Sequence, residues 1–561
     1  MTHEPSPQTP APQSAQDTRP AQAKQDPGPG EQFAIRAGKR ERLRAEGWDP
    51  YPVQLPITST IEDVRDRFGG LSTGTMALEA GYAESEAIVG IAGRVVLLRN
   101  TGKLCFATLQ DGAGATLQVR LSARSLPGRG HSSLAAFKTD VDLGDHLFVH
   151  GQVGVSRRGE LSVFAEPVLR AGVSAEDLAD VGDDDVVVPA WRIASKAQRP
   201  LPKTWTNEAG ESVTLSEEQR VRRRELDLLT RPAARDMIRT RAAVVRSLRD
   251  NFHRRGYLEL ETPMLQVVHG GAAARPFTTH MNALDTELYL RIATEIYLKR
   301  AVVGGVERVF EINRNFRNEG MDSSHSPEFA ALEAYEAYSD YNGMAALTRD
   351  LIQQAARDAF DLPEGGEVVR LADGTDYDLS GQWDTIDLYT SVSEALGEEV
   401  TVDTPRERLV ALAEGLGLEV DDYAVAGKIV EDIFEVTVGD RLWAPTFVYD
   451  FPEDTSPLTR YHRSRPGLTE KWDLYVRGVE TATAYSELAD PVVQRERFEA
   501  QALAAANGDP EAMMLDEDFL VAMEQGFPPC GGMGMGIDRL LMVLTGQGIR
   551  ETIAFPLVKR S

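Results

Sequence analysis

The sequence predicts a multidomain α+β protein, and three observations lead to this prediction. The chain has 561 residues, which is too long for one hydrophobic core. Between about residues 85 and 172, short alternating strands are separated by Gly, Asp and Asn turns, as in a small closed β-barrel. From residue 236 onward, strands alternate with helices up to Ser561. We therefore expect a barrel domain at 85–172, for which the OB-fold is the commonest design, and a larger domain at 236–561.

The composition narrows the class of protein. Hydrophobic residues make up 42% and charged residues 26%, as in ordinary globular proteins. No run of about 18 apolar residues occurs, and the first residues lack a charged-then-apolar signal pattern, so we expect no membrane partner and a cytoplasmic location. Cys105 and Cys530 form no CxxC pair, which excludes a zinc site of the cysteine type. The net charge of −27 argues against non-specific nucleic-acid coating, and we expect no DNA partner.

The remaining segments are read from composition and periodicity. Residues 1–30 are rich in Pro, Gln and Ala and are expected to form a disordered tail, followed by an N-terminal helical segment at 31–84. Residues 173–235 are expected to connect the two domains. Basic clusters at 36–44 and 220–256 are either nucleic-acid contacts or ion-paired helix surfaces, with about equal support. In the barrel, Phe106 could stack on a base, but we favour a core position for it.

One charged stretch, RVFEINRNFRNEGMDSSHSPEFAALEAYEAY, indicates an anion site. Its first part alternates like a strand, a loop follows, and the last part fits a strand or a helix. Arg314 and Arg317 point to opposite sides of such a strand, so we expect one of them to face a ligand, and Arg317 at the loop edge is the better candidate. The alternative is a structural Arg–Glu pair within the hairpin.

A second stretch, EKWDLYVRGVETATAYSELADP, predicts a hairpin that turns at Arg477 and Gly478. In that register Glu480 lies opposite Tyr475 and shares a face with Asp473. Two carboxylates on one sheet face favour a bound cation, and Mg²⁺ carried by a nucleotide suits a site with few protein ligands. An exposed acidic hairpin without a ligand is the alternative.

Two strand-to-helix junctions complete the set of candidate sites. In PPCGGMGMGIDRLLMVLTGQ, glycines lead into a helix that carries Arg539 in its first turn, against the helix dipole, which suggests that Arg539 meets a ligand. In LYLRIATEIYLKR we expect a strand to end at Ala293, Thr294 to cap a helix, and Glu295 to lie in its first turn. No P-loop and no clean GxGxxG motif occurs.

Together these segments resemble the three signature motifs of class II aminoacyl-tRNA synthetases. The helix followed by GYLELETPML is similar to motif 1, FRNEG with HSPEF to motif 2, and GMGMGIDRLLMVL to motif 3. The barrel resembles the anticodon-binding OB-fold domain of the subgroup for lysine, aspartate and asparagine. The pieces GGAAARPF, LYLRIATEIYLKR, RVFEINRNFRNEG and GIDRL resemble bacterial lysyl-tRNA synthetases in particular. The resemblance covers nearly everything after residue 30 and implies a mixed, mainly antiparallel catalytic sheet flanked by helices, and a homodimer.

The resemblance also implies a reaction and its residues. L-Lysine would be activated with ATP to lysyl-adenylate and transferred to the 3′ end of tRNA(Lys). Arg317 and Arg539 would be catalytic, and Asp473 and Glu480 would hold Mg²⁺. The implied lysine-binding residues are Gly271, Glu295, Glu333, Tyr335, Thr483, Tyr485 and Glu487. The implied ATP-binding residues are Arg317, Glu319, His325, Phe329, Gly534 and Arg539.

The residue types agree with this assignment, because an acidic pocket suits a substrate with two ammonium groups. Asp473 stands where the family usually has Glu, Thr483 and Tyr485 replace an amide and a phenyl ring, and Ser324 replaces an Arg. Three alternatives remain: an aspartyl- or asparaginyl-type synthetase, a paralogue that serves a non-tRNA acceptor, and a non-catalytic RNA-binding protein with an OB-fold.

Overall fold

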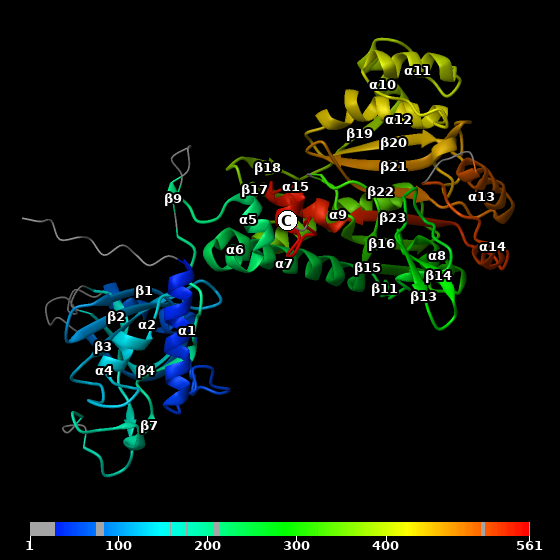
Figure 1. Cartoon of the computed structure of the whole chain (residues 1–561). Coiled ribbons are helices and arrows are strands. Elements are labelled where there is room, and N and C mark those ends of the chain that lie inside the picture. Colours follow the sequence, from blue (N-terminus) through cyan, green and yellow to red (C-terminus); the bar gives the residue numbers. More distant parts are fainter. Residues whose placement is uncertain are drawn as a thin grey trace, which may run out of the picture. The chain divides into compact units, whose positions relative to one another are not determined.

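The structure is a computed structural model that describes residues 29–73, 83–156, 159–174, 178–203, 205–206, 212–322, 324–506 and 511–559. The chain forms two compact units, Met1–Ser212 and Val213–Ser561, which we call the N-terminal and the C-terminal unit (Figure 1). The tail predicted at 1–30 lies outside the described residues, except for its end, where helix α1 (Pro29–Ala45) already begins.

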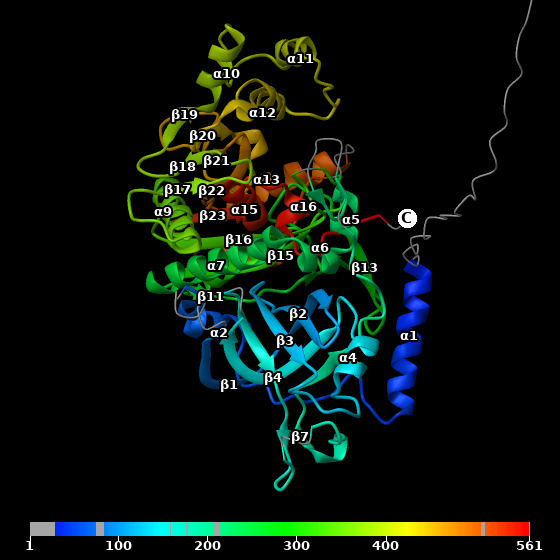
Figure 2. The same cartoon turned by 90° about the vertical axis from the view of Figure 1, so that its left-hand side faces the viewer.

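The core of the N-terminal unit is a closed barrel. Its strands are β1 (Ala83–Asn100), β2 (Leu104–Gln110), β3 (Thr116–Ser122), β4 (His146–Val155) and β5 (Leu161–Ala165). Strand β1 pairs with both β2 and β4, which closes the ring in the order β1-β2-β3-β5-β4. Helices α2 (Ile61–Phe68) and α4 (Leu134–Asp140) lie beside it (Figure 2). The predicted OB-fold barrel is confirmed.

Residues 173–235 do not form a separate connector. Strand β8 (Trp191–Ser195) pairs with β4 and extends the barrel sheet. The buried Lys196, next in the chain, forms an ion pair of 2.7 Å with Asp145. The helices α5 (Glu217–Arg222) and α6 (Arg224–Thr230) belong to the C-terminal unit, and α7 (Pro232–Arg254) begins before residue 236. The segment is therefore divided between the two units.

A mixed sheet organises the C-terminal unit. In spatial order its strands are β11 (Leu258–Glu259), β15 (Arg308–Phe316), β16 (Glu328–Ala337), β23 (Cys530–Gly536), β22 (Val479–Ser486), β21 (Leu468–Val476), β20 (Thr446–Pro452) and β19 (Asp384–Asp387). Only the outer pairs β11–β15 and β19–β20 are parallel within this sheet as described. The mainly antiparallel sheet is thus confirmed, and 328–337 forms a strand, not a helix.

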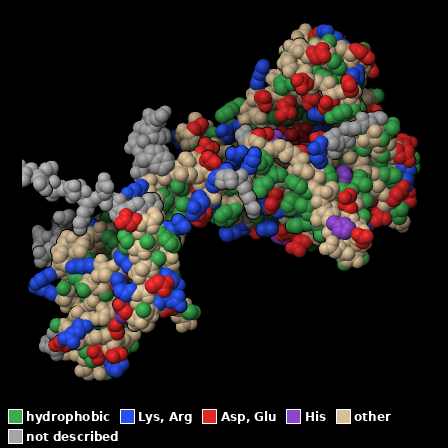
Figure 3. All heavy atoms as spheres, viewed as in Figure 1, with side chains coloured by type: hydrophobic (Ala, Val, Ile, Leu, Met, Phe, Trp, Pro, Cys, Tyr) green, Lys and Arg blue, Asp and Glu red, His purple; other side chains and the backbone are tan. Residues whose placement is uncertain are grey.

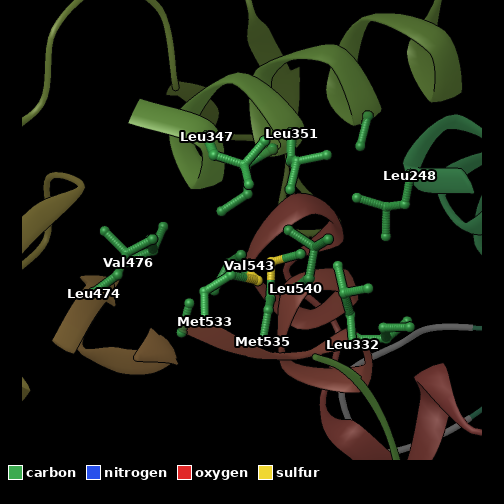
Figure 4. Close-up of a cluster of buried hydrophobic side chains, with 14 of the residues drawn as sticks. Leu248, Leu332, Leu347, Leu351, Leu474, Val476, Met533, Met535, Leu540 and Val543 are labelled. Carbon is green, nitrogen blue, oxygen red and sulfur yellow. The ribbon is translucent and has the colours of Figure 1, made fainter. Parts of the chain in front are cut away.

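Helices cover one face of this sheet completely. The helices are α7, α9 (Tyr341–Phe360) and α15 (Ile537–Thr545), and their buried residues form one cluster with those of the strands. In Figure 4, Leu248, Leu351 and Leu540 lie close to the strand residues Leu332 and Met535. Because side chains alternate along a strand, the neighbours of Leu332 in β16 point to the opposite face.

Among the described residues, helices pack on the opposite face at its two ends. Helices α8 (Glu295–Val303), α13 (Pro491–Ala506) and α14 (Glu517–Met523) pack at one end. Helices α10 (Leu388–Leu396), α11 (Arg406–Gly415) and α12 (Ala426–Thr437) pack on β20 and β21 at the other. Figure 3 shows a hollow beside the α10–α12 segment in which acidic side chains gather.

Smaller elements refine two sequence predictions. The sheet of β12 (Leu265–Gln266), β13 (Thr278–Met281) and β14 (Thr286–Leu290) precedes α8, so the strand ends at Leu290 and not at Ala293.

The two basic clusters are largely ion-paired, for example Lys39 with Asp142 at 2.8 Å, which favours the interpretation as helix surfaces. Within the described ranges, no helix has the length and apolarity needed to cross a membrane.

Candidate active site

Strand register aligns the predicted site residues across the sheet. Glu333 of β16 pairs with Gly534 of β23, which pairs with Thr483 of β22, and Thr483 pairs with Asp473 of β21. The adjacent row is Tyr335, Gly532, Tyr485 and Lys471. These two rows bring together six residues that the sequence assigned to lysine, ATP or metal, although they come from four strands.

The Glu333 carboxylate is fixed by hydrogen bonds from two sides. The Thr294 backbone N–H donates to its Oε1 at 3.0 Å, and Asn315 Nδ2 donates to the same oxygen at 3.4 Å. Burial raises the pKa of Glu333, and the Thr294 donor opposes this effect. The expected side-chain cap by Thr294 is wrong, because its hydroxyl oxygen instead accepts a hydrogen bond of 3.0 Å from Asn313 Nδ2.

A buried lysine lies between the other two pocket carboxylates. Lys299 Nζ is 2.5 Å from Glu295 Oε1 and also forms an ion pair with Glu487. All three side chains are buried, with Lys299 fully inaccessible. Burial raises the pKa of Glu487 to about 8, although Lys299 opposes the shift. Burial disfavours the charge of Lys299, but the two carboxylates outweigh it and raise its pKa.

The role of Lys299 was not predicted from the sequence. One feature of the sequence could have indicated this buried cation. Glu295 and Lys299 are spaced i,i+4 in a segment that also contains the buried apolar residues Ile296, Leu298 and Val302. An i,i+4 pair is usually a surface pair of small energetic weight, so spacing alone does not reveal a buried cation.

Three glycines shape the pocket. Gly271 has φ +87°, a conformation that favours glycine, and an added Cβ would lie 3.0 Å from the Cβ of Glu295. A Cβ at Gly532 would collide with Glu487 and Tyr335. At Gly534 the nearest atoms would be 3.8 Å away, so the sheet surface is open there to a closely approaching ligand.

Arg317 stands at the edge of the motif-2 loop with its charge available. Its guanidinium carbon lies 5.2 Å from the ring centroid of Phe329, and its buried Nε has no hydrogen-bond partner among the described residues. Arg314 instead lines a separate cavity of about 520 Å³. The Arg–Glu pair within this hairpin is Arg308 with Glu336, at 2.6 Å. Arg291, which precedes α8, pairs with Glu311 at 2.7 Å, and neither pair involves Arg317.

The other residues assigned to ATP include Glu319 and His325 on the loop after β15, and Arg539 in the first turn of α15. Arg539 Nη2 donates to His325 Nε2 at 3.1 Å, and Arg539 Nη1 donates to the Glu480 backbone oxygen at 2.9 Å. With Nε2 as acceptor, His325 Nδ1–H donates to Asp322 Oδ2 at 2.8 Å. Glu319 lies on the same loop and accepts from the Arg275 backbone N–H at 3.4 Å.

Asp473 and Glu480 lie on the predicted hairpin. The turn has φ +55° at Arg477 and +70° at Gly478, and Glu480 pairs with Tyr475, so the hairpin and this pairing are confirmed. Beyond Tyr475 the register shifts, and Leu474 pairs with Ala482. Burial raises the pKa of Asp473 to about 6, with Lys471 opposing the shift and Glu480 adding to it. Lys471 Nζ is 3.2 Å from Asp473 Oδ2.

The Asp473 and Glu480 carboxylates suit a metal ion that has few protein ligands. Asp473 Oδ1 is buried without a hydrogen-bond partner in the described part of the chain, and Glu480 is half-exposed. No cluster of three or more His, Cys, Asp or Glu side chains suited to a metal occurs among the described residues. The pair therefore fits Mg²⁺ whose other ligands are water and nucleotide oxygens, which is the usual pattern for this ion.

The site thus has an acidic and a basic part. Three carboxylates and one lysine give the pocket at Glu333 a net charge of −2 when all are ionised, which suits a ligand with two positive groups. Arg317 and Arg539 lie toward the loop and suit phosphate or carboxylate oxygens.

A barrel of nucleic-acid-binding type together with this sheet and site defines a class II tRNA synthetase of the aspartate, lysine and asparagine group. Residues 216–559 match the family "tRNA synthetases class II (D, K and N)", and residues 89–168 match the "OB-fold nucleic acid binding domain". The chain is 56% identical over 532 residues to a lysine–tRNA ligase of Mycolicibacterium gilvum, covering 94% of this chain and 97% of that protein. Lysine–tRNA ligases of Kineococcus radiotolerans and Mycobacterium tuberculosis are 56% and 54% identical, with the same coverage. The chain belongs to the lysine–tRNA ligase family.

Proposed function

We propose that this protein activates L-lysine with ATP and transfers it to the 3′ end of tRNA(Lys). The observation that carries the proposal is the pocket of Glu295, Glu333 and Glu487, in which Lys299 is the one contacting cation among the described residues. A lysine substrate brings two ammonium groups to this pocket, whereas an aspartate or asparagine side chain would add no positive charge to it.

The residues divide between the two substrates. Glu333, with Gly271 and Glu295, faces the α-ammonium group, and Tyr335 and Glu487 face the ε-ammonium group. Thr483 and Tyr485 line the wall along the side chain. Arg317 bridges the lysine carboxylate and the α-phosphate of ATP, and Phe329 stacks on adenine beside the open surface at Gly534. Glu319, His325 and Arg539 hold the remaining ATP groups.

The chemistry follows from these positions. The lysine carboxylate is ionised at neutral pH, so its attack on the α-phosphorus needs no general base. Arg317 orients the carboxylate and neutralises charge that develops on the α-phosphate, while Arg539 neutralises the departing pyrophosphate. Mg²⁺, when held by Asp473 and Glu480, supplies further neutralisation of phosphate charge.

Pyrophosphate exchange into ATP, measured with each of the twenty amino acids, tests the proposal. We expect exchange with L-lysine, its loss in EDTA and its recovery with Mg²⁺. Exchange with aspartate or asparagine but not lysine would contradict the assigned substrate, and exchange that persists in EDTA would contradict the metal.

The outer face of the barrel supplies a surface for tRNA. Phe106 is half-buried outside the barrel core, so the expectation of a core position is wrong. A cross-strand row runs from Arg99 to Phe106, Arg120, Phe164 and Gln152. The guanidinium of Arg99 lies 5.4 Å from the Phe106 ring centroid, and that of Arg120 lies 5.0 Å from the Phe164 ring centroid. Alternating aromatic and cationic side chains suit stacked, unpaired bases.

Phe106→Ala is therefore expected to lower kcat/KM for tRNA by about 10- to 100-fold, since a base–aromatic stack contributes about 1–3 kcal/mol. Lysine-dependent pyrophosphate exchange should be unchanged, because that step does not use tRNA. The control is Phe33→Ala, which removes an exposed aromatic ring of α1 in the same unit. Equal aminoacylation by Phe106→Ala and wild type would contradict this surface.

Exposed apolar side chains support the homodimer that motif 1 implies. Leu258, Met264, Leu265 and Val267 are between 49% and 65% exposed within ten residues of chain. Several exposed apolar side chains in one short segment are typical of a protein interface. We propose that a second copy covers it, and sedimentation would detect a monomer of 61.6 kDa if it does not. The cytoplasmic location stays a prediction.

A further inference from the structure

Lys299 places a fixed cation inside the pocket that the proposed function assigns to a cationic amino acid. Its Nζ contacts Glu295 Oε1 and Glu487 Oε2, which leaves the second oxygen of each carboxylate for other partners. Glu487 Oε1 is buried, has no hydrogen-bond partner among the described residues, and lies against Gly532 next to Tyr335. The carboxylate is thus anchored through one oxygen while the other is directed at the pocket floor.

Stability alone does not account for this arrangement. Taking three charged groups out of water is costly, and buried ion pairs are often no more stabilising than apolar residues of similar volume. Lys299 is also surrounded by apolar residues of its own helix, where an aliphatic side chain would pack equally well. The charge is therefore better explained by what it does to Glu295 and Glu487.

We propose that Lys299 is a positioning residue, the resident counter-cation of the amino-acid pocket, which opposes the protonation of Glu295 and Glu487 and orients both carboxylates before the substrate binds. This inference rests on the proposed function and extends it to selectivity. When all three carboxylates are ionised beside Lys299, the pocket has two uncompensated negative charges, and only an amino acid with a second ammonium group neutralises both. Without Lys299, the carboxylates would take up protons, and an uncharged side chain would be rejected less strongly.

The titratable groups that affect the ionisation of Glu295 and Glu487 come from four elements. They are Glu295 and Lys299 of α8, Glu333 and Tyr335 of β16, Tyr485 with Glu487 at the end of β22, and Cys530 of β23. Of these described groups only Lys299 is cationic, so its removal shifts the proton affinity of all the carboxylates in the same direction.

Lys299→Met tests the inference, because methionine keeps most of the volume and removes the charge. We expect the KM for lysine to rise about 10- to 100-fold at pH 7, which corresponds to a carboxylate pKa higher by about one to two units. The kcat should change less than threefold and the KM for ATP should stay constant. The preference for L-lysine over L-norleucine, measured as a ratio of kcat/KM, should fall about tenfold or more.

The pH profile separates a charge effect from a packing effect. Lysine binds to the ionised carboxylates, so its KM is high below their pKa and falls as the pH rises. In the wild type the fall should end near pH 8, where Glu487 titrates. In Lys299→Met it should continue to higher pH, since no cation opposes the effect of burial. Arg300→Met is the control on the same helix, because its guanidinium lies over Tyr297 and not on a pocket carboxylate.

Chemical rescue keeps the inference testable if the methionine variant is unstable. Lys299→Ala removes the side chain beyond Cβ, and the removed part corresponds to n-propylamine. We expect added n-propylammonium to restore the KM for lysine in this variant, and n-propanol to have no such effect. Equal rescue by both compounds, or a lysine KM within threefold of wild type in Lys299→Met, would overturn the inference. Absence of lysine-dependent exchange in the wild type would instead overturn the proposed function.

Discussion

Replacing Arg317 with alanine is expected to lower lysine-dependent pyrophosphate exchange by about 10³-fold. Loss of one well-placed donor to a developing charge costs about 2.7–4 kcal/mol, and Arg317 is proposed to serve the attacking carboxylate and the α-phosphate together. Its Nε has no hydrogen-bond partner among the described residues, so truncation breaks no ion pair that holds the fold. The loss should therefore appear in kcat and not in the melting temperature.

Arg314→Ala is the matched control for this variant. Arg314 lies three residues earlier, within β15, and lines a cavity that does not include Phe329. We expect its exchange rate to stay within tenfold of wild type. If the two variants lose activity equally, or if Arg317→Ala exchanges at the wild-type rate, the assignment of Arg317 is wrong.

Local features of the sequence were sufficient to predict several elements. The Arg477-Gly478 turn and the pairing of Glu480 with Tyr475 follow from hairpin geometry, because a two-residue turn fixes the pairs next to it, whereas the register shift beyond Tyr475 was not predicted. The barrel was predicted from its alternating strands, and Gly304 and Gly305 mark the end of α8 as expected.

The parts that could not be predicted depend on contacts between distant segments. Strand β23 lies between β16 and β22, about 200 and 50 residues away in sequence, and only this pairing puts Gly534 beside Glu333 and Thr483. Strand β8 joins the barrel although turns separate it from the other strands. Lys299 was missed because burial, not spacing, distinguishes it from a surface i,i+4 pair. Phe106 was assigned to the core because alternation gives two faces without saying which is inside.

Replacing Glu487 with glutamine is expected to raise the KM for lysine about 10²- to 10⁴-fold. An ammonium group buried without its carboxylate loses about 3–5 kcal/mol, which sets this range. Glu487 is 2% exposed, so water cannot compensate for the missing charge. The KM for ATP should be nearly unchanged, because the assigned ATP residues lie at the loop and at α15. Glu496→Gln, on the exposed side of α13, is the control and should behave as wild type.

The pH dependence of the KM for lysine is a second, independent test of Glu487→Gln. In the empty pocket Glu487 has a pKa of about 8, raised by burial, so below pH 8 it carries a proton that the ε-ammonium group must displace. The wild-type KM for lysine should thus fall as the pH rises from 6 to 8, by up to about tenfold per unit for one proton, and then level off. Glutamine has no such proton, and the slope due to this position should disappear. A wild-type KM that is constant between pH 6 and 8, or a slope that survives in Glu487→Gln, would show that another group controls lysine binding.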